Sequence, residues 1–164
     1  MGGNNVVVEA SEFTGVKSRS LYFQGSWNNQ NTITIKDSKF SNGGNDGGIY
    51  LSEMGDALLE NNEFVNNAGF YVNIDYRWGD VTLKNNKFNG NKSGSFGVNN
   101  QYANDQAQGG TVLFEGNSII AGSSYSHEGI SVGNQRKGSE ILIKNNIIET
   151  KNTGITVYDY QNNN

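Results

Sequence analysis

The stretch Val81-Thr82-Leu83-Lys84-Asn85-Asn86-Lys87-Phe88 decides the fold of this chain, because its pattern recurs along the whole sequence. Val81 and Leu83 point to the same side of a strand, since side chains alternate across a strand. Asn85 and Asn86 then turn the chain, because asparagine tolerates the left-handed backbone and hydrogen-bonds to nearby amides. Phe88 re-enters the interior on the next short strand, so the stretch predicts two strands joined by a corner.

An alternating apolar triplet followed by an aromatic or isoleucine anchor occurs six times, at spacings of 24 to 31 residues. These triplets and anchors are Val6–Val8 with Phe13, Ile33–Ile35 with Phe40, Ala57–Leu59 with Phe64, Val81–Leu83 with Phe88, Val112–Phe114 with Ile119, and Ile141–Ile143 with Ile148. A second alternating triplet follows each anchor: Leu21–Phe23, Ile49–Leu51, Val72–Ile74, Phe96–Val98, Ile130–Val132 and Ile155–Val157. A period of about 20 to 50 residues indicates stacked units that bury their apolar faces only against one another.

We therefore predict an all-β fold, a parallel β-solenoid of about six coils with three short strands per coil, as one domain over residues 1–164. The expected repeat units are 5–30, 31–55, 56–79, 80–109, 110–138 and 139–164. Neither end of this sequence carries a polar cap, which stacked repeats need for solubility. We expect further coils of a longer protein at the ends, or end-to-end association with other copies.

Two rows of side chains support stacking in register. Four residues before the anchors the charge alternates in sign, at Glu9, Lys36, Glu60, Lys84, Glu115 and Lys144. Opposite charges on adjacent strands are favourable and like charges are not, so stacked coils select this alternation. Two residues before the anchors stand Ser11, Ser38, Asn62, Asn86, Asn117 and Asn146, which predict a hydrogen-bonded asparagine ladder at the first corner.

Composition excludes several classes of function. The net charge of -4 and the isoelectric point near 4.9 are unsuited to nucleic acid, which requires a concentrated basic surface. No apolar run reaches the length of a membrane span, so we predict no membrane insertion. The chain has no cysteine, which excludes disulfides and thiolate metal sites.

The phrases Ile33–Phe40 leading to Gly48–Leu51, and Ile141–Ile148 leading to Gly154–Val157, resemble the right-handed parallel β-helix superfamily typified by pectate lyases. The resemblance covers essentially the whole chain, but this scaffold carries many activities. It implies that the strand of the second triplet forms the floor of a groove for neutral or acidic polysaccharides. It also implies that a lyase would use an Arg or Lys base with carboxylate-bound calcium, and a hydrolase paired or triple Asp.

Carried onto this chain, the resemblance gives two rows of outward floor positions. The first row is Tyr22, Tyr50, Asn73, Gly97, Ser131 and Thr156, and the second is Gln24, Ser52, Asp75, Asn99, Gly133 and Tyr158. Asp75 is the only carboxylate in these rows, and neither Lys nor Arg occurs in them. Hydrolysis by two acids needs a pair of carboxylates across the bond, so the floor lacks that machinery.

The richest patch follows the third floor strand, in the segment Asp75-Tyr76-Arg77-Trp78-Gly79-Asp80, which we expect to be a loop. Aromatic faces stack on sugar rings, and Arg pairs with carboxylates such as those of uronic acids. The predicted carbohydrate-binding residues are Tyr50, Asp75, Tyr76, Arg77, Trp78 and Tyr102. The alternative is that Arg77 stacks on Trp78 and pairs with a neighbouring acid, which stiffens the loop.

Two insertions, 99–111 and 121–128, lengthen loops that would flank the floor, and binding faces of repeat proteins commonly carry such insertions. The second holds His127, the sole histidine, for which the sequence shows no organising partner. Asp75 with Glu53 and Asp56 is the best candidate for a calcium site. Calcium requires six to eight oxygen ligands, so no cofactor is predicted.

The function predicted from the sequence is a secreted or cell-surface β-helix module that binds a polysaccharide or acidic glycan along one face. The first alternative is a structural or adhesive rod that assembles through its ends. The second is a fragment of a polysaccharide lyase, with Arg77 as the base. The sequence leaves open whether the protein is an enzyme.

Overall fold

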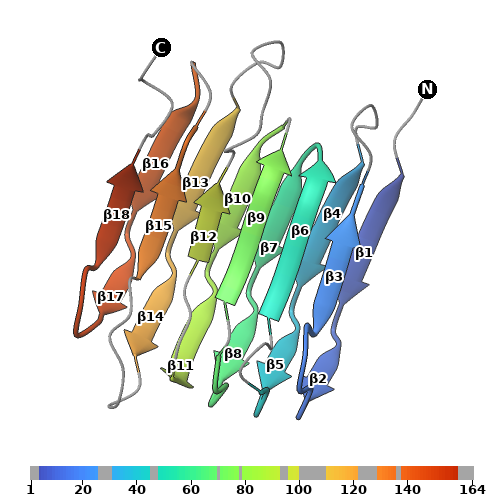
Figure 1. Cartoon of the computed structure of the whole chain (residues 1–164), viewed down its shortest axis with the longest axis vertical. Helices are drawn as coiled ribbons and strands as arrows, with labels where there is room; N and C mark the ends of the chain where they lie inside the picture. The colour runs from blue at the N-terminus through green and yellow to red at the C-terminus, as the bar shows by residue number, and fades with distance from the viewer. Residues whose placement is uncertain are drawn as a thin grey trace.

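The computed structural model describes residues 4–25, 31–44, 48–69, 71–77, 79–92, 96–99, 110–121, 129–135 and 138–158. Within these ranges the chain forms 18 β-strands in three parallel sheets of six strands, here named sheets A, B and C (Figure 1). Successive strands along the chain belong to different sheets, so the backbone winds around a central column. The predicted parallel β-solenoid is confirmed.

Each coil contributes one strand to each sheet, which confirms the predicted three strands per coil. Sheet A contains β1 (Asn5–Glu9), β4 (Thr32–Lys36), β7 (Ala57–Glu60), β10 (Val81–Lys84), β13 (Thr111–Glu115) and β16 (Glu140–Lys144). Sheet B contains β2 (Glu12–Thr14), β5 (Lys39–Ser41), β8 (Glu63–Val65), β11 (Lys87–Asn91), β14 (Ser118–Ala121) and β17 (Ile147–Glu149). Sheet C contains β3 (Leu21–Gln24), β6 (Gly48–Met54), β9 (Tyr71–Arg77), β12 (Phe96–Asn99), β15 (Ile130–Gly133) and β18 (Ile155–Tyr158).

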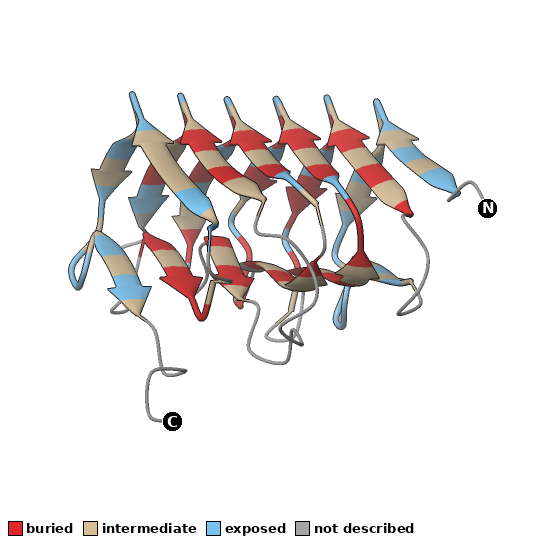
Figure 2. Ribbon diagram, turned by 90° about the horizontal axis from the view of Figure 1, so that it is seen from above, coloured by how far each residue is buried: buried red, intermediate tan, exposed pale blue. Residues whose placement is uncertain are grey.

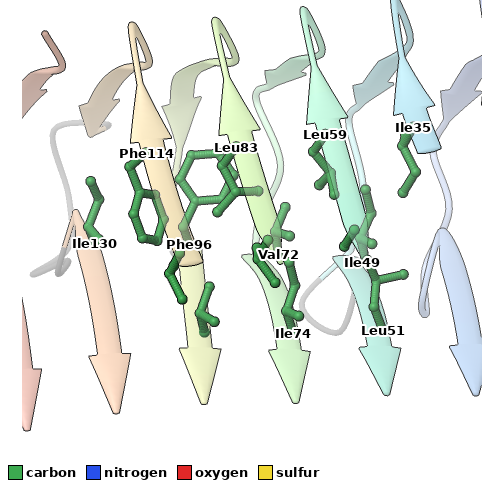
Figure 3. Close-up of a cluster of buried hydrophobic side chains, with 14 of the residues drawn as sticks. Ile35, Ile49, Leu51, Leu59, Val72, Ile74, Leu83, Phe96, Phe114 and Ile130 are labelled. Atoms are coloured by element: carbon green, nitrogen blue, oxygen red, sulfur yellow. The ribbon is translucent and has the colours of Figure 1, made fainter. Parts of the chain in front are cut away.

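Alternate residues of each strand fill the column between the sheets. In β4, Ile33 and Ile35 are buried, whereas Thr32, Thr34 and Lys36 remain partly exposed. This two-residue period recurs as red and tan bands on the inner strands of Figure 2. Apolar side chains from facing sheets meet in the column, as Figure 3 shows. Each coil thus buries its apolar residues mainly against the coils above and below.

The anchors of the first four coils form a single file of aromatic rings. Ring centroids lie 4.7 Å apart for Phe13 and Phe40, 5.2 Å for Phe40 and Phe64, and 4.3 Å for Phe64 and Phe88. Because one ring per coil stacks on the next, a one-residue slip of a strand would turn its anchor toward solvent. The file therefore helps to fix the register between coils.

The coils are not equivalent, although the sequence predicts about six similar ones. About four turns, formed by the strands β4 to β15, lie between two neighbours and have fully buried interiors. The inward residues of the first and last coils are only partly covered among the described residues, and Ile155 and Val157 are 45% and 59% exposed. Among the described strands, those of these two coils pair on one side only, which accounts for their lower burial.

The first corner, between sheets A and B, carries the predicted asparagine ladder. The amide N–H and Nδ2 of Asn62 donate to Oδ1 of Asn86, at 3.0 Å each, and those of Asn86 donate to Oδ1 of Asn117, at 2.9 and 3.1 Å. Asn86 Nδ2 also donates to the carbonyl of Leu59 at 2.9 Å. The side chains of Asn62 and Asn86 are fully buried, so these bonds satisfy polar groups that water does not reach.

A second ladder, which the sequence pattern did not reveal, lies at the corner after sheet B. The amide N–H of Gly43 donates to Oδ1 of Asn67 at 2.8 Å, and that of Asn67 donates to Oδ1 of Asn91 at 2.9 Å. Asn67 and Asn91 each stand three residues after a phenylalanine anchor. A search for asparagine at a fixed distance from the anchors predicts the first ladder. The same search, three residues after the anchor, would have found the second.

The alternating charges lie in adjacent strands as predicted. The register pairs Glu9 with Lys36, Lys36 with Glu60, Glu60 with Lys84, Lys84 with Glu115, and Glu115 with Lys144. Lys36 Nζ lies 2.9 Å from Glu9 Oε1, and this hydrogen bond raises the pKa of Lys36. The row runs along the outer surface of sheet A.

Candidate functional site

The outer face of sheet C brings together the residues that the sequence places on a groove floor. The register aligns Tyr22, Tyr50, Asn73, Gly97, Ser131 and Thr156 in one row across the six strands. It aligns Gln24, Ser52, Asp75, Asn99, Gly133 and Tyr158 in a second row. Both predicted rows are confirmed as rows. Hydroxyl, amide and aromatic groups therefore repeat along the axis of the solenoid at about the strand spacing of 4.8 Å.

A tyrosine pair forms the N-terminal part of this face. The rings of Tyr22 and Tyr50 stack with centroids 5.5 Å apart and planes inclined by 9°. The guanidinium of Arg19 lies 4.7 Å from each ring centroid, within cation–π range of both. Tyr22 is 50% exposed, so the pair presents aromatic surface to solvent.

Hydrogen bonds connect the tyrosine pair to the polar groups beside it. Tyr22 Oη donates to Gln24 Oε1 at 2.6 Å, and Gln24 Nε2 donates to Glu53 Oε1 at 3.1 Å. Gln24 and Glu53 belong to neighbouring coils, so the chain of bonds spans the coil boundary.

The strands β6 and β9 each contain an irregularity that redirects the residues after it. Glu53 and Tyr76 adopt the left-handed backbone, with φ of 54° and 51°. The next residues, Met54 and Arg77, pair in register and are both buried. A residue in this conformation interrupts the alternation of the strand, so that the side chain after it points inward. We predicted that Asp75 to Asp80 form a loop, and this is wrong for Asp75, Tyr76 and Arg77, which belong to β9.

Arg77 is therefore an interior residue with an exposed fraction of 1%. Its Nη1 donates to the carbonyl of Gly79, and its Nη2 donates to the carbonyl of Gly110 at 3.3 Å and to Gln135 Oε1 at 2.7 Å. Gln135 Nε2 in turn donates to the carbonyls of Gly133 and Val98, at 2.7 and 3.1 Å. The guanidinium thus bonds to two backbone carbonyls and to the Gln135 side chain, which itself bonds to two further carbonyls. It does not face the outer surface of sheet C.

Two titratable groups on the face are shifted by partial burial. Burial raises the pKa of the Tyr50 hydroxyl, and a hydrogen bond with the Ser52 side chain offsets part of this effect. Burial likewise raises the pKa of the Asp75 carboxyl, while the amide N–H of Tyr76, 2.9 Å from Asp75 Oδ1, opposes the shift. Both groups are thus less readily ionised than in water.

Glycine shapes the middle and the far end of the face. A Cβ at Gly97 would lie 3.6 Å from Asn73 Oδ1, so the position is open and lowers the floor between its neighbours. At Gly133 a Cβ would lie 2.2 Å from the ring of Tyr158, which therefore covers this glycine. The face thus has tyrosine surface near both ends and a low, polar middle.

The described part of this outer face carries mainly hydroxyl, amide and aromatic groups, with few charges. On the outer face of sheet C, the described acids are Asp75 and Glu53, and the described cation is Arg19 next to the tyrosine pair. Within the described ranges there is no cluster of three His, Cys, Asp or Glu residues arranged to hold a metal ion. The same ranges contain no helix able to cross a membrane.

Comparison with known protein families matches residues 1–125 to the family described as "Right handed beta helix region". The chain belongs to the right-handed β-helix family. Searches of curated proteins and of solved structures each gave no match. Family membership establishes the architecture of this β-helix and its handedness. Family membership by itself assigns no activity, because this fold carries many functions.

The structure places the six predicted binding residues of this β-helix in different settings. Tyr50 and Asp75 lie on the outer face of sheet C, in adjacent strands, and Tyr76 follows Asp75 at the irregularity. Arg77 is buried, as described above. Trp78 and Tyr102 lie outside the described residues, as do His127 and most of both insertions.

Sequence reasoning missed the contribution of Arg19 and of the bond from Gln24 to Glu53. Arg19 precedes β3 by two residues, and neither its spacing nor its neighbours mark it as a partner of two tyrosines. The alignment of Tyr22 with Tyr50 could have indicated this contact. Arg19 stands three residues before Tyr22 and can reach both rings once they are stacked. The β-helix register, once known, makes that inference direct.

Proposed function

We propose that this β-helix binds a polysaccharide along the outer face of sheet C. The observation that carries the proposal is the stacked pair of Tyr22, which is exposed, and Tyr50, which is partly exposed, at one end of a row of hydroxyl and amide groups. Aromatic rings stack on the apolar faces of sugars, and hydroxyl and amide groups bond to their hydroxyls. A polymer lying along the solenoid axis would meet a similar set of groups at each coil.

We further propose that the polymer is neutral rather than acidic. An acidic glycan would require cationic partners, and the guanidinium of Arg77, which the sequence offered for that role, is buried. Glu53 and Asp75 add acidic groups beside the floor, while Arg19 is already engaged with the two tyrosine rings. Like charges across an interface are unfavourable. A location outside the cell or at its surface follows from this function, because extended polysaccharides occur there.

The test is a screen of neutral and acidic polysaccharides, followed by titration of the best binder by calorimetry. Tyr50→Ala should weaken binding by about tenfold or more, because it removes the stacking surface, whereas Tyr50→Phe retains that surface and should retain most of the affinity. Asn89→Ala, at an exposed position of β11 in sheet B, is the control. Equal binding by wild type and Tyr50→Ala would refute the assignment to this face. A preference for acidic polymers would refute the proposal that the polymer is neutral.

A rod that assembles through its end coils is a second candidate function. It is favoured by the exposure of Ile155 and Val157, whose side chains occupy inward positions that are buried in the inner coils. Association of this kind would continue without limit, because each added copy would present a new edge. Small-angle scattering that shows rods lengthening with concentration would support it. Particles of fixed size at all concentrations would exclude it.

Catalysis as a polysaccharide lyase is not part of the proposal. The base considered for it, Arg77, is enclosed by the backbone carbonyls of Gly79 and Gly110 and by Gln135. An assay for unsaturated sugar products in the ultraviolet, with the polysaccharides of the screen, addresses this alternative directly.

A further inference from the structure

The outer face of sheet A has a character different from that of sheet C. Its middle row consists of Val7, Thr34, Leu58, Thr82, Leu113 and Leu142, aligned by the register of the six strands. Val7 is 59% exposed, and the other members of the row are partly exposed. In Figure 2, where sheet A forms the upper layer, no other described segment lies above it. Sheet A therefore presents a straight apolar stripe to its surroundings.

The alternating charges run alongside this stripe, one row further along the strands. From the first coil to the last the signs are negative, positive, negative, positive, negative and positive, from Glu9 to Lys144. When the row is read in the reverse order, every position has the opposite sign. A row of six alternating charges can thus face an inverted copy of itself with an opposite charge at every position.

We propose that this face binds a second copy of the chain, related by a twofold axis that lies between the two sheets and parallel to their strands. Such an axis reverses the order of the coils but keeps each row opposite the same row. Glu60 would then face Lys84 of the second copy, Lys36 would face Glu115, and Glu9 would face Lys144. The contact is isologous, as in most homodimers, because both copies use the same surface.

The apolar stripe is complementary to itself under the same operation. Leu58 meets Thr82 of the second copy, Leu113 meets Thr34, and Leu142 meets Val7. Each leucine therefore lies opposite a smaller β-branched residue, so that large and small side chains can interdigitate between two sheets about 10 Å apart. Because the strands of the two copies run in the same direction, the packing is of the aligned type.

The charge row alone would not justify the proposal, because stacking within one chain also selects alternation, as the contact of Glu9 with Lys36 shows. The stripe is the independent observation. The stacking of coils does not require leucine on an outer surface. It also does not require that a leucine and a smaller residue occupy the positions that the twofold axis brings together. One pair at the other border of the face, Asp56 with Asp80 of the second copy, is unfavourable. Each of these carboxylates already accepts a backbone N–H of the next coil, at 2.8 and 2.7 Å.

The size of the face sets the expected affinity. Six strands of about five residues span roughly 25 Å by 16 Å, or about 400 Å² of flat area per copy. Side-chain relief increases the buried area, but the total remains at the lower end of specific interfaces. We therefore expect a reversible dimer with a dissociation constant in the micromolar range. This surface is separate from sheet C, so the inference does not depend on glycan binding.

The test is sedimentation velocity of the 164-residue chain over concentrations from about 1 µM to about 1 mM, with Glu60→Lys and Lys84→Glu measured separately and as a mixture. In a homodimer of either variant, both central contacts pair like charges, so dimerisation should weaken by about tenfold or more. In the mixed dimer, the introduced lysine of one copy faces the introduced glutamate of the other, and the native Lys84 and Glu60 face each other. Association should therefore return to within about threefold of wild type.

Mixing separates contacts between chains from contacts within one chain, because each variant carries the same internal change whether it is mixed or not. The matched controls are Glu63→Lys and Lys87→Glu, which make the same change at two paired positions of sheet B, in β8 and β11, and should leave dimerisation unaltered. A wild-type chain that stays monomeric throughout the range overturns the proposal. So does a mixture no more associated than its components, or assembly into particles larger than dimers.

Discussion

Asn86 and Asn73 are the same residue type in adjoining parts of the solenoid, and their surroundings give them opposite roles. Asn86 is fully buried at the corner between β10 and β11, where it bonds to the coils on both sides. Asn73 projects from the middle of β9, partly exposed on the outer face of sheet C. The inner corners hold the coils in register, whereas the outer faces are partly exposed to solvent. Polar residues in this sequence therefore divide by position rather than by type.

Replacing Asn86 by alanine should have the largest effect. It removes the acceptor of the Asn62 amide and the donor to the Leu59 carbonyl, and it leaves both buried groups without their partner. Each unsatisfied group costs about 1–3 kcal/mol, so we expect the two together to lower the free energy of unfolding, measured in urea, by about 2–6 kcal/mol. Asn73→Ala is the control, with a change within about 0.5 kcal/mol. Equal losses in the two variants would contradict the division between corner and face.

Arg77 tests the division at a residue whose chemistry favours a binding role. Arg77→Met should lower the free energy of unfolding by about 2 kcal/mol, because Gly110 and Gln135 lose their donor. Methionine is the appropriate replacement, since Met54 occupies the corresponding buried position one coil earlier. Affinity of the folded variant for the polysaccharide, measured by calorimetry well below the melting midpoint, should equal that of wild type. Weaker binding with unchanged stability would restore Arg77 to the site.

Arg77 also shows what the sequence can predict here and what it cannot. Strand positions, register, the first asparagine ladder and the two floor rows follow from a simple alternation, which the stacked coils repeat. The alternation fails where Tyr76 takes the left-handed backbone and Arg77 turns inward. A single tyrosine with positive φ leaves no pattern in its own coil. The indication is only visible across coils, where Arg77 aligns with the apolar Met54 instead of with another polar residue.

The interactions of Arg19 are unpredictable for a different reason. Its position depends on the path of the segment before β3, which no repeated pattern describes, and on two rings from separate coils. Likewise, the stripe of Val7, Leu58 and Leu113 is evident in the sequence only after the register has placed these residues in one row. Local periodicity predicts the elements, whereas surfaces arise from contacts between residues about one coil apart.

Gly97 allows the outer face to be altered without disturbing the interior. Gly97→Ala adds a methyl group that meets Asn73 Oδ1 at 3.6 Å, an ordinary contact, so stability should change by no more than about 0.5 kcal/mol, in the favourable direction. The methyl group raises the floor of the face, so affinity for the polysaccharide should fall. Gly133→Ala offers a contrast, because it must move the ring of Tyr158 and should lower the melting midpoint. Unchanged affinity in Gly97→Ala would move the binding path away from the middle of the face.

Asp75 should give the smallest effect, and one that depends on pH. Burial raises the pKa of its carboxyl above the ordinary value of 3.8, so ionisation is less favourable in the folded chain than in the unfolded one. That penalty is absent below pH 3.8 and complete above the folded-state pKa, which means that it opposes folding at neutral pH. Asp75→Asn should therefore raise the melting midpoint at pH 7 by about 1 °C, a modest shift because the group is partly exposed. The gain should vanish as the pH falls below 3.8, whereas any shift in Asn73→Ala should not depend on pH. A lower midpoint for Asp75→Asn at pH 7 would mean that the ionised carboxylate is stabilised by the outer face, which would make it part of the structural set with Asn86.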